Sequence, residues 1–295
     1  MSRTKARGAG LELSAAACVL LAALAACGGA RPQAKSGGGA PARPKAQDVS
    51  AADVKTEPYA GKMVYVVVAL CDNVNQGIVP VAPALGNGDD ADRNLYWGAR
   101  FGVRTHFKAS REWQLVSAAR DPSPKVLERL VYRHKKSDAY MVADAYRGAE
   151  IKQATADFLN AASGNTNPTV EIQGKTYGLS KGAAAHLVAY VGHDGLMDFQ
   201  LAYVPKRRDD VRRDAVILAC ISKKYFAPSL RESGANPLLW TTNLMAPEAY
   251  VLKAALDGWL IGEDGERVRE RAAKAYDTYQ NCGIKSARSL FATGW

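Results

Sequence analysis

The sequence lacks the short motifs by which nucleic-acid-binding and nucleotide-binding proteins are usually found. It contains no zinc-finger, ribonucleoprotein or P-loop pattern, although 39 lysine and arginine residues against 29 acidic ones give a formal net charge of +10. The glycine-rich turn Gly86-Asn87-Gly88 is not followed by a lysine and a helix at the spacing that a phosphate loop needs. We therefore expect no nucleic-acid partner, and the charge favours anionic lipid, glycan or acidic protein instead.

Histidine and cysteine are scarce, with 4 and 5 residues in a chain of 295. No H-x-H or H-E-x-x-H spacing is present, so the sequence predicts neither a metal site nor a cofactor. A metal-dependent hydrolase stays open as an alternative, because four residues are chemically acceptable ligands for a divalent ion. These residues are Asp72, Asp144, His193 and Asp194.

The longest largely apolar stretch lies at the N-terminus. Three basic residues precede residues 11–26, which are apolar except for Glu12 and Ser14. The stretch ends in Leu24-Ala25-Ala26-Cys27, which resembles the lipobox of bacterial lipoproteins, where the cysteine is acylated and the chain is cut just before it. We therefore predict residues 1–26 as a lipoprotein signal peptide and Cys27 as the lipidation site.

Acyl chains on Cys27 would hold the protein on a membrane, since each buried methylene contributes roughly 0.8 kcal/mol. Loss of residues 1–26 removes three basic residues and one acidic one, which lowers the net charge from +10 to +8. No aspartate follows Cys27, a pattern that resembles the sorting signal for the outer membrane. Residues 27–60 are rich in Ala, Gly, Pro and Lys and predict a flexible, lipid-anchored linker, followed by a single domain at residues 61–295.

From residue 61 onward, apolar runs of strand length alternate with helical patterns. Residues 63–70 form a continuous β-branched run, typical of a strand buried on both faces. Further strands are predicted at 114–117, 139–143, 187–191, 215–219 and 238–241, helices at 94–107, 124–134, 150–162, 247–260 and 266–279, and a hairpin at 169–177. This alternation indicates an α/β fold, a three-layer sandwich with a mostly parallel central sheet.

Reactive side chains follow two successive predicted strands. His193 comes after the strand at 187–191, and Cys220 comes after the strand at 215–219. Because the carboxyl ends of parallel strands share one edge of a sheet, we expect the two residues to meet there. An imidazole that takes a thiol proton creates a thiolate nucleophile, so we predict His193 and Cys220 as a catalytic pair. Polar residues at strand ends predict the substrate-binding part of the cleft: Asp72, Asn73, Asp144, Asp194 and Gly195.

Two segments at these strand ends carry a family resemblance. Tyr190-Val191-Gly192-His193 and Leu218-Ala219-Cys220-Ile221-Ser222 are similar to motifs of the caspase, legumain and gingipain type of cysteine peptidase (clan CD). In that group one hydrophobic strand ends in His-Gly and the next ends in Ala-Cys, whereas here Asp194 separates the histidine from Gly195. The resemblance covers about residues 62–245.

The resemblance implies a caspase-like fold and hydrolysis of peptide bonds. It makes His193 the general base and Cys220 the nucleophile, with backbone N–H groups near Gly195 and Cys220 binding the oxyanion. It also implies that Asp72 and Asn73 face the pocket for the residue before the scissile bond. The partners expected on this basis are membrane lipid, through acylated Cys27, and a peptide or protein substrate in the bacterial cell envelope.

Two questions stay open at this point. A catalytically inactive domain of the same fold would serve as a binding or scaffolding module in the cell envelope. A disulfide between Cys71 and Cys282 would leave Cys220 as the free thiol, whereas the alternative is that all three are small buried residues.

Overall fold

The computed structural model describes residues 59–165, 169–179 and 185–295. The predicted signal peptide, Cys27 and most of the predicted linker therefore lie outside the described residues. Five strands of the central sheet run parallel: β1 (Lys62–Ala69), β4 (Ala139–Tyr146), β7 (Leu187–Val191), β8 (Asp214–Leu218) and β9 (Asn236–Thr241). Three antiparallel strands complete it: β2 (Trp113–Ser123), β3 (Val126–His134) and β10 (Phe291–Ala292).

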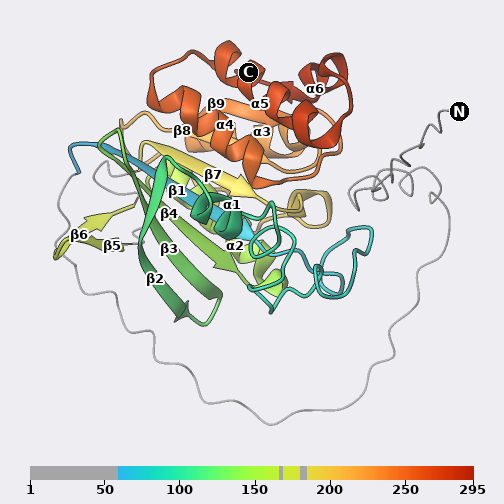
Figure 1. Cartoon of the computed structure of the whole chain (residues 1–295), viewed down its shortest axis with the longest axis horizontal. Helices are drawn as coiled ribbons and strands as arrows, with labels where there is room; N and C mark the ends of the chain where they lie inside the picture. Colours follow the sequence, from blue (N-terminus) through green and yellow to red (C-terminus); the bar gives the residue numbers. More distant parts are fainter. Residues whose placement is uncertain (1–58, 166–168, 180–184) are drawn as a thin grey trace, which may run out of the picture. The chain divides into compact units, whose positions relative to one another are not determined.

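The strand order across this sheet is β10-β9-β8-β7-β1-β4-β3-β2 (Figure 1). We call the edge at which the five parallel strands start the amino edge, and the edge at which they end the carboxyl edge. The strands β5 (Thr169–Ile172) and β6 (Lys175–Gly178) form the hairpin predicted around Gly174. This hairpin is a separate two-stranded sheet. The positive φ of 75° at Gly174 fits a turn position that glycine adopts without steric cost.

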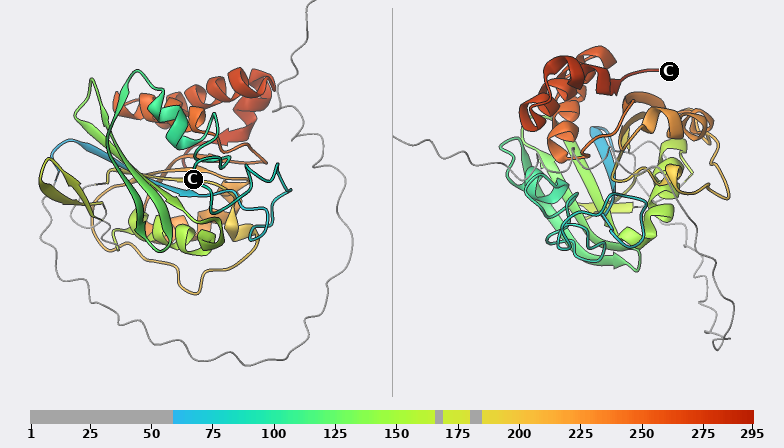
Figure 2. Two further views of the ribbon diagram at one scale, coloured as in Figure 1. Left: turned by 60° about the horizontal axis from the view of Figure 1, so that its bottom comes forward. Right: turned by 90° about the vertical axis from the view of Figure 1, so that its right-hand side faces the viewer.

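Helices cover both faces of the sheet (Figure 2). One face packs against α2 (Ile151–Ser163) and α3 (Ser222–Ser233). The other packs against α1 (Val103–Lys108), α4 (Ala249–Leu260), α5 (Gly265–Gln280) and α6 (Ile284–Leu290). The prediction of an α/β fold with a mostly parallel, helix-covered sheet is confirmed. None of the helices in the described part of the chain combines the length and apolarity that a membrane crossing requires.

The β1 strand shows why its sequence is apolar throughout. Alternate strand side chains point to opposite faces, so Val64 and Val66 enter one core while Tyr65 and Val67 enter the other. All four side chains are essentially excluded from solvent. A strand in the middle of a sheet with helices on both faces therefore has no polar side.

The predicted helix at 124–134 is wrong, because this segment is strand β3, paired with β2 and β4. Val126, Leu130 and Val131 fit one helix face, but they also fit a strand buried on both sides. Buried apolar or aromatic residues lie on both faces of the strand, and Glu128 is buried in an ion-pair network. Tertiary pairing overrides the helical spacing here.

The predicted helix at 94–107 is largely wrong, because only α1 (Val103–Lys108) is helical. Residues before it form turns, held by Asn94, whose amide group bonds the backbone of Cys71 and of Asn87. Gly102 is extended, with φ of −70° and ψ of 158°, and serves as the N-cap. Residues 70–102, which we call the β1–α1 loop, therefore cross the carboxyl edge mainly as irregular chain.

Candidate active site

The two predicted catalytic residues lie at matching positions on neighbouring parallel strands. The β7–β8 register pairs Val191 with Leu218, and the Gly192 N–H donates to the Leu218 carbonyl at 3.2 Å. His193 and Cys220 are each two residues beyond this pair. The structure thus brings both to the carboxyl edge, on strands that neighbour one another in the sheet.

Gly192 turns the chain at the end of β7. Its φ of 152° lies in the region that side chains rarely adopt, and a Cβ there would stand 2.8 Å from the Ala69 carbonyl oxygen. Glycine therefore allows β7 to pass close to β1 just before His193.

The thiol of Cys220 is half-buried and engaged with the backbone of Met245. The Met245 N–H donates to Sγ at 3.4 Å, and the thiol donates to the Met245 carbonyl at 3.6 Å. Burial raises the pKa of the thiol, the Met245 N–H opposes this rise, and the nearby Asp194 carboxylate adds to it. In this arrangement the thiol is protonated at neutral pH.

Ile221, directly after the cysteine, has a strained backbone. Its φ of 51° and ψ of 30° are left-handed, which a β-branched residue adopts only at a cost of roughly 1–2 kcal/mol. Three hydrogen bonds hold this turn. The Ile221 N–H donates to the Asn243 carbonyl, and the Ser222 hydroxyl donates to the Ile217 carbonyl and accepts the Thr241 N–H. The strained turn thus holds Cys220 just before the N-terminus of α3, where the helix dipole favours an anion.

His193 is paired with a carboxylate that the sequence prediction missed. Its Nε2 lies 2.7 Å from Oδ2 of Asp198, and the same oxygen accepts the Gly77 N–H at 3.0 Å. The His193 ring is nearly buried, with 7% of its side chain exposed, and its carbonyl accepts the Tyr190 hydroxyl. The only sequence signal for Asp198 is its position five residues after His193, across the short helical turn η3 (Gly195–Met197).

The predicted pair does not form a direct hydrogen bond. No bond joins Cys220 to His193 in the described part of the chain, since Cys220 bonds Met245 and Nε2 of His193 faces Asp198. With Nε2 engaged, Nδ1 is the ring nitrogen left to exchange a proton with a thiol.

Asp194 is the carboxylate whose charge raises the pKa of the Cys220 thiol. It is fully buried, its Oδ1 accepts the Leu196 N–H at 3.0 Å, and its Oδ2 has no hydrogen-bond partner in the described part of the chain. Burial raises the pKa of Asp194 to about 7, the Leu196 N–H opposes the rise, and the charge of Asp198 adds to it. This group therefore changes its protonation near neutral pH.

Gly195, the next predicted site residue, is needed for close packing. A Cβ at this position would lie 2.5 Å from the Phe199 ring and 3.3 Å from Ile151. Its absence allows η3 to lie against the N-terminus of α2, which positions both Asp194 and Asp198.

Asp72 and Asn73 also lie at the carboxyl edge, but their side chains are used to fold the β1–α1 loop. Asp72 accepts the backbone N–H groups of Val74 and Asn75 at 2.8 and 3.1 Å. Asn73 donates to the Val81 carbonyl and accepts the Val81 N–H. Turn formation accounts for the polar atoms of both residues, so the structure gives no separate sign of substrate contact there.

Asp144 does not belong to the edge, because β4 continues past it to Tyr146. Its carboxylate bonds Arg129 through two N–H groups, each at 2.6 Å, and accepts the Tyr65 hydroxyl at 2.8 Å. With Asp157 and other residues this group lines a cavity of about 240 Å³ on the α2 face. The structure therefore does not bring Asp144 to the carboxyl edge with His193 and Cys220, because β4 ends at Tyr146 and not at residue 143 as predicted.

The question of a disulfide, which the sequence left open, is answered by the structure: Cys71, Cys220 and Cys282 are all free thiols. Cys71 is fully buried at the end of β1, and burial raises its pKa to about 11. Burial raises the pKa of Tyr96 in the β1–α1 loop, and the charges of Cys71 and Cys220 add to the rise, so this tyrosine lies within electrostatic range of both thiols. Sequence reasoning did not identify it, because a loop tyrosine carries no distinguishing local pattern.

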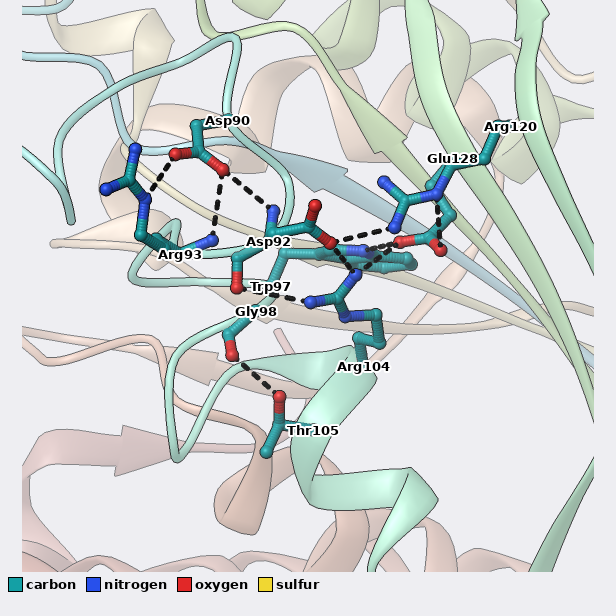
Figure 3. Close-up of polar contacts among 9 residues, drawn as sticks. All are labelled: Asp90, Asp92, Arg93, Trp97, Gly98, Arg104, Thr105, Arg120 and Glu128. Atoms are coloured by element: carbon teal, nitrogen blue, oxygen red, sulfur yellow. Dashed lines mark hydrogen bonds and ion pairs between the residues drawn. The ribbon is translucent and has the colours of Figure 1, made fainter.

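A charged network fastens the β1–α1 loop to the antiparallel side of the sheet (Figure 3). Asp92 pairs with Arg104 at 2.5 Å and with Arg120 at 2.8 Å. The same two arginines contact the buried Glu128, which also accepts the Trp97 indole N–H at 2.5 Å. This network links the loop over the candidate site to β2 and β3, and it explains why Glu128 is tolerated inside a strand.

The four residues named as possible metal ligands are not gathered into one cluster in the described part of the chain. Within the described ranges, no three His, Cys, Asp or Glu side chains lie together as a metal site would require. Asp72, Asp144, His193 and Asp194 therefore do not form the ligand cluster of the metal-dependent alternative. No family model, curated protein or solved structure matches the chain.

Proposed function

We propose that this protein is a lipid-anchored lipoprotein of the bacterial cell envelope, on the outer membrane, whose α/β domain is a cysteine peptidase of the caspase, legumain and gingipain type. The observation that carries the proposal is the matched position of His193 and Cys220. Each follows by two residues a member of the Val191–Leu218 pair, which joins the adjacent parallel strands β7 and β8. The resembling motifs supply the second support, because they put the same two residues at strand ends.

The proposed reaction uses His193 as base and Cys220 as nucleophile. Nδ1 of His193 accepts the thiol proton while Asp198 holds the ring through Nε2. The thiolate attacks the carbonyl carbon of a peptide bond, and backbone N–H groups near Gly195 and Cys220 bind the developing oxyanion. The C–N bond then breaks as the imidazolium returns its proton to the leaving amine, and water hydrolyses the remaining thioester.

This reaction needs a rearrangement of the contacts around the thiol. Sγ must exchange its contacts with Met245 for one with His193, and substrate binding is the step that supplies the free energy. Asp194 favours the reaction in its protonated form, since an ionised carboxylate beside Sγ raises the pKa of the thiol.

A catalytically inactive binding module is the second candidate, and a specific observation favours it. Both hydrogen bonds of the thiol go to the Met245 backbone, and the side chains of Asp72 and Asn73 are fully used within their own loop. In that case Cys220 is a structural residue that fastens the segment after β9 to the end of β8.

Thiol alkylation separates the two candidates. Iodoacetamide labelling across a pH series, with each cysteine followed by peptide mass spectrometry, should show that Cys220 reacts much faster than Cys282. Cys282 is the internal reference, because it is also partly exposed and burial raises its pKa too. The proposal expects His193→Ala to slow Cys220 labelling sharply.

His106→Ala is the matched control, because His106 is half-buried on α1, outside the site. It should leave the rate of Cys220 labelling unchanged. Labelling of Cys220 no faster than a model thiol, with no effect of His193→Ala, would refute the peptidase and leave the binding module.

The anchor is tested independently by mass spectrometry of the mature N-terminus. Acylated Cys27 is the expected first residue, and Cys27→Ser should abolish both the modification and the cleavage before it. An unmodified N-terminus at another residue contradicts the lipoprotein assignment while leaving the peptidase proposal standing.

A further inference from the structure

The amino edge of the sheet, opposite the candidate active site, carries a concave surface. It is an open cavity of about 420 Å³, lined by Arg212, Arg231, Gly234, Ala235, Asn236 and Trp295. Arg212 precedes β8, Arg231 is in the last turn of α3, and Asn236 opens β9. We call this surface the arginine pocket. It has two cationic side chains and no acidic one among its lining residues.

The two arginines of the pocket are poorly neutralised. Arg212 is 79% exposed and reaches Asp214 only at 4.0 Å, while the Asp214 carboxylate already bonds Asn236 at 2.7 Å. Arg231 has no carboxylate within ion-pair distance in the described part of the chain. Its guanidinium instead stacks at 4.2 Å from the ring centre of Trp295.

A neighbouring arginine shows what a structural ion pair looks like in the same segment. Arg213 is 1% exposed and makes two bonds to Asp209, at 2.7 and 2.8 Å. Arg212, one residue earlier, has neither the burial nor the close partner. The contrast indicates that Arg212 and Arg231, which both line the pocket, keep donors free for a ligand.

The aromatic wall of the pocket is also incompletely covered. Trp295 is 50% exposed, and its edge packs on the buried Trp240 with ring centres 5.4 Å apart. A half-exposed tryptophan beside cationic side chains is the arrangement found at membrane interfaces, where an indole lies at the level of the lipid headgroups.

The connection before β8 brings charges of both signs to the amino edge, and Arg207 lies 3.5 Å from the exposed Asp210. Residues 206–208 are Lys-Arg-Arg, and the Arg207 side chain lies against Gly234 at the rim of the pocket. The described chain also begins at this edge, since Tyr59 packs on Tyr140 near the start of β4.

We propose that the arginine pocket binds a phosphate group, and that its source is the headgroup of an anionic phospholipid. Guanidinium groups match phosphate oxygens in bidentate geometry, which the two poorly neutralised arginines that line one cavity can provide. The choice of a lipid source rests on the lipid anchor proposed above, but the phosphate site itself does not. A domain bound in this way turns its amino edge to the membrane and its candidate active site away from it.

Vesicle sedimentation tests the site with the unacylated chain from Gly28 to Trp295. This chain keeps every residue of both core clusters, which lie between residues 63 and 291. It should sediment with phosphatidylcholine vesicles that contain phosphatidylglycerol, and not with pure phosphatidylcholine. Arg212→Gln and Arg231→Gln should each weaken this binding about fivefold, the loss expected for one basic residue at an anionic surface.

Lys224→Gln is the matched control. It removes one positive charge from an exposed residue of the same helix as Arg231, but near the start of α3 at the carboxyl edge. It should change vesicle binding by less than twofold. An equal loss for Lys224→Gln and Arg231→Gln would show that binding follows net charge alone and would overturn the pocket.

Glycerol 1-phosphate separates the two sources of phosphate. Displacement of the protein from vesicles by this soluble phosphate, with the same dependence on Arg212 and Arg231, supports the lipid headgroup. Binding of glycerol 1-phosphate without any preference for anionic vesicles overturns the lipid source and keeps a site for a soluble phosphomonoester. If the protein binds neither anionic vesicles nor glycerol 1-phosphate, the proposal is overturned, whatever the state of Cys27.

Discussion

Two fully buried aspartates, Asp144 and Asp194, lie on different sides of β1 and have opposite electrostatic surroundings. Asp144 receives three hydrogen bonds, two from Arg129 and one from Tyr65, so both of its oxygens are satisfied. Asp194 has one partner, the Leu196 N–H, and one oxygen without a partner among the described residues. The first carboxylate is compensated and serves the fold, whereas the second is left uncompensated beside the Cys220 thiol.

The difference matters because an uncompensated buried charge opposes folding. A protein retains such a group when another property depends on it, and perturbed carboxyl groups gather at functional sites. The strained Ile221 belongs to the same region, whereas the Asp144 cluster lies within regular strands. Strain and missing hydrogen bonds therefore coincide at the candidate site and not at the structural ion pair.

The largest effect on stability is expected when the ion pair between Arg129 and Asp144 is broken. Arg129→Met leaves the Asp144 carboxylate buried without its cation and should lower the free energy of unfolding by about 3–5 kcal/mol. Urea unfolding followed by circular dichroism measures the loss. The double variant Arg129→Met/Asp144→Asn removes both charges and should recover at least half of it. No recovery would mean that Arg129 acts through packing and that Asp144 is not the compensated partner.

At neutral and alkaline pH, Asp194→Asn should raise the free energy of unfolding, whereas Arg129→Met lowers it. The folded pKa of Asp194 is raised from 3.8 to about 7, so the folded state holds the proton more tightly than the unfolded state does. This contribution to stability is fully present below pH 3.8 and is lost as the pH rises through 7, a loss of about 4 kcal/mol.

The amide that replaces the carboxyl group in Asp194→Asn has no proton to lose, so the variant should lack this part of the pH dependence. Urea unfolding at a series of pH values from acid to alkaline measures it. The variant should also label faster at Cys220 above pH 7, because ionised Asp194 raises the pKa of the thiol. Parallel pH profiles for parent and variant would contradict the description of Asp194 as uncompensated.

A smaller effect is expected from relieving the strain after Cys220. Ile221→Gly should raise the free energy of unfolding by about 0.5–1 kcal/mol, since glycine adopts the left-handed conformation freely but loses more entropy on folding. Asn281→Gly is the control, because Asn281 has the same φ of 51° and asparagine tolerates it. Destabilisation by Ile221→Gly would show that side-chain packing outweighs the backbone strain.

The smallest effect on stability is expected at the His193 partner. The Asp198 side chain is 36% exposed, so Asp198→Asn should change the free energy of unfolding by at most about 1 kcal/mol. It should nevertheless slow Cys220 labelling, because the ring of His193 loses the charge that orients it. Thermal unfolding and alkylation rates measured on one preparation separate the two effects; a large loss of stability would make the pair structural.

The sequence was informative where burial is uniform. The β-branched run of β1 and the apolar strands β7 and β8 were predicted almost to the residue, because central parallel strands must be apolar on both faces. The same uniformity misled the prediction for β3, whose apolar residues satisfy helical and strand spacing equally. When a segment fits both spacings, pairing with the neighbouring strands decides which structure forms.

The candidate site was predictable in position and not in detail. His193 and Cys220 were found because a strand ends just before each of them. Asp198 and Tyr96 were missed because each reaches the site through an irregular turn or loop, and Asp144 was assigned to the site because the end of β4 was set too early. The arginine pocket joins Arg212, residues 231–236 and Trp295, which are three separate segments of the chain, so no local pattern marks it.

The amino-acid sequence by itself determined that the described domain is an α/β protein with a parallel core, since hydrophobic periodicity is a local property. It also placed a histidine and a cysteine after consecutive strands. Only the tertiary structure decided which carboxylate each of them meets, which thiols stay free and which arginines lack a close carboxylate within the described ranges. Those outcomes depend on contacts between residues far apart in the chain, where burial and distance set the strength of every charge.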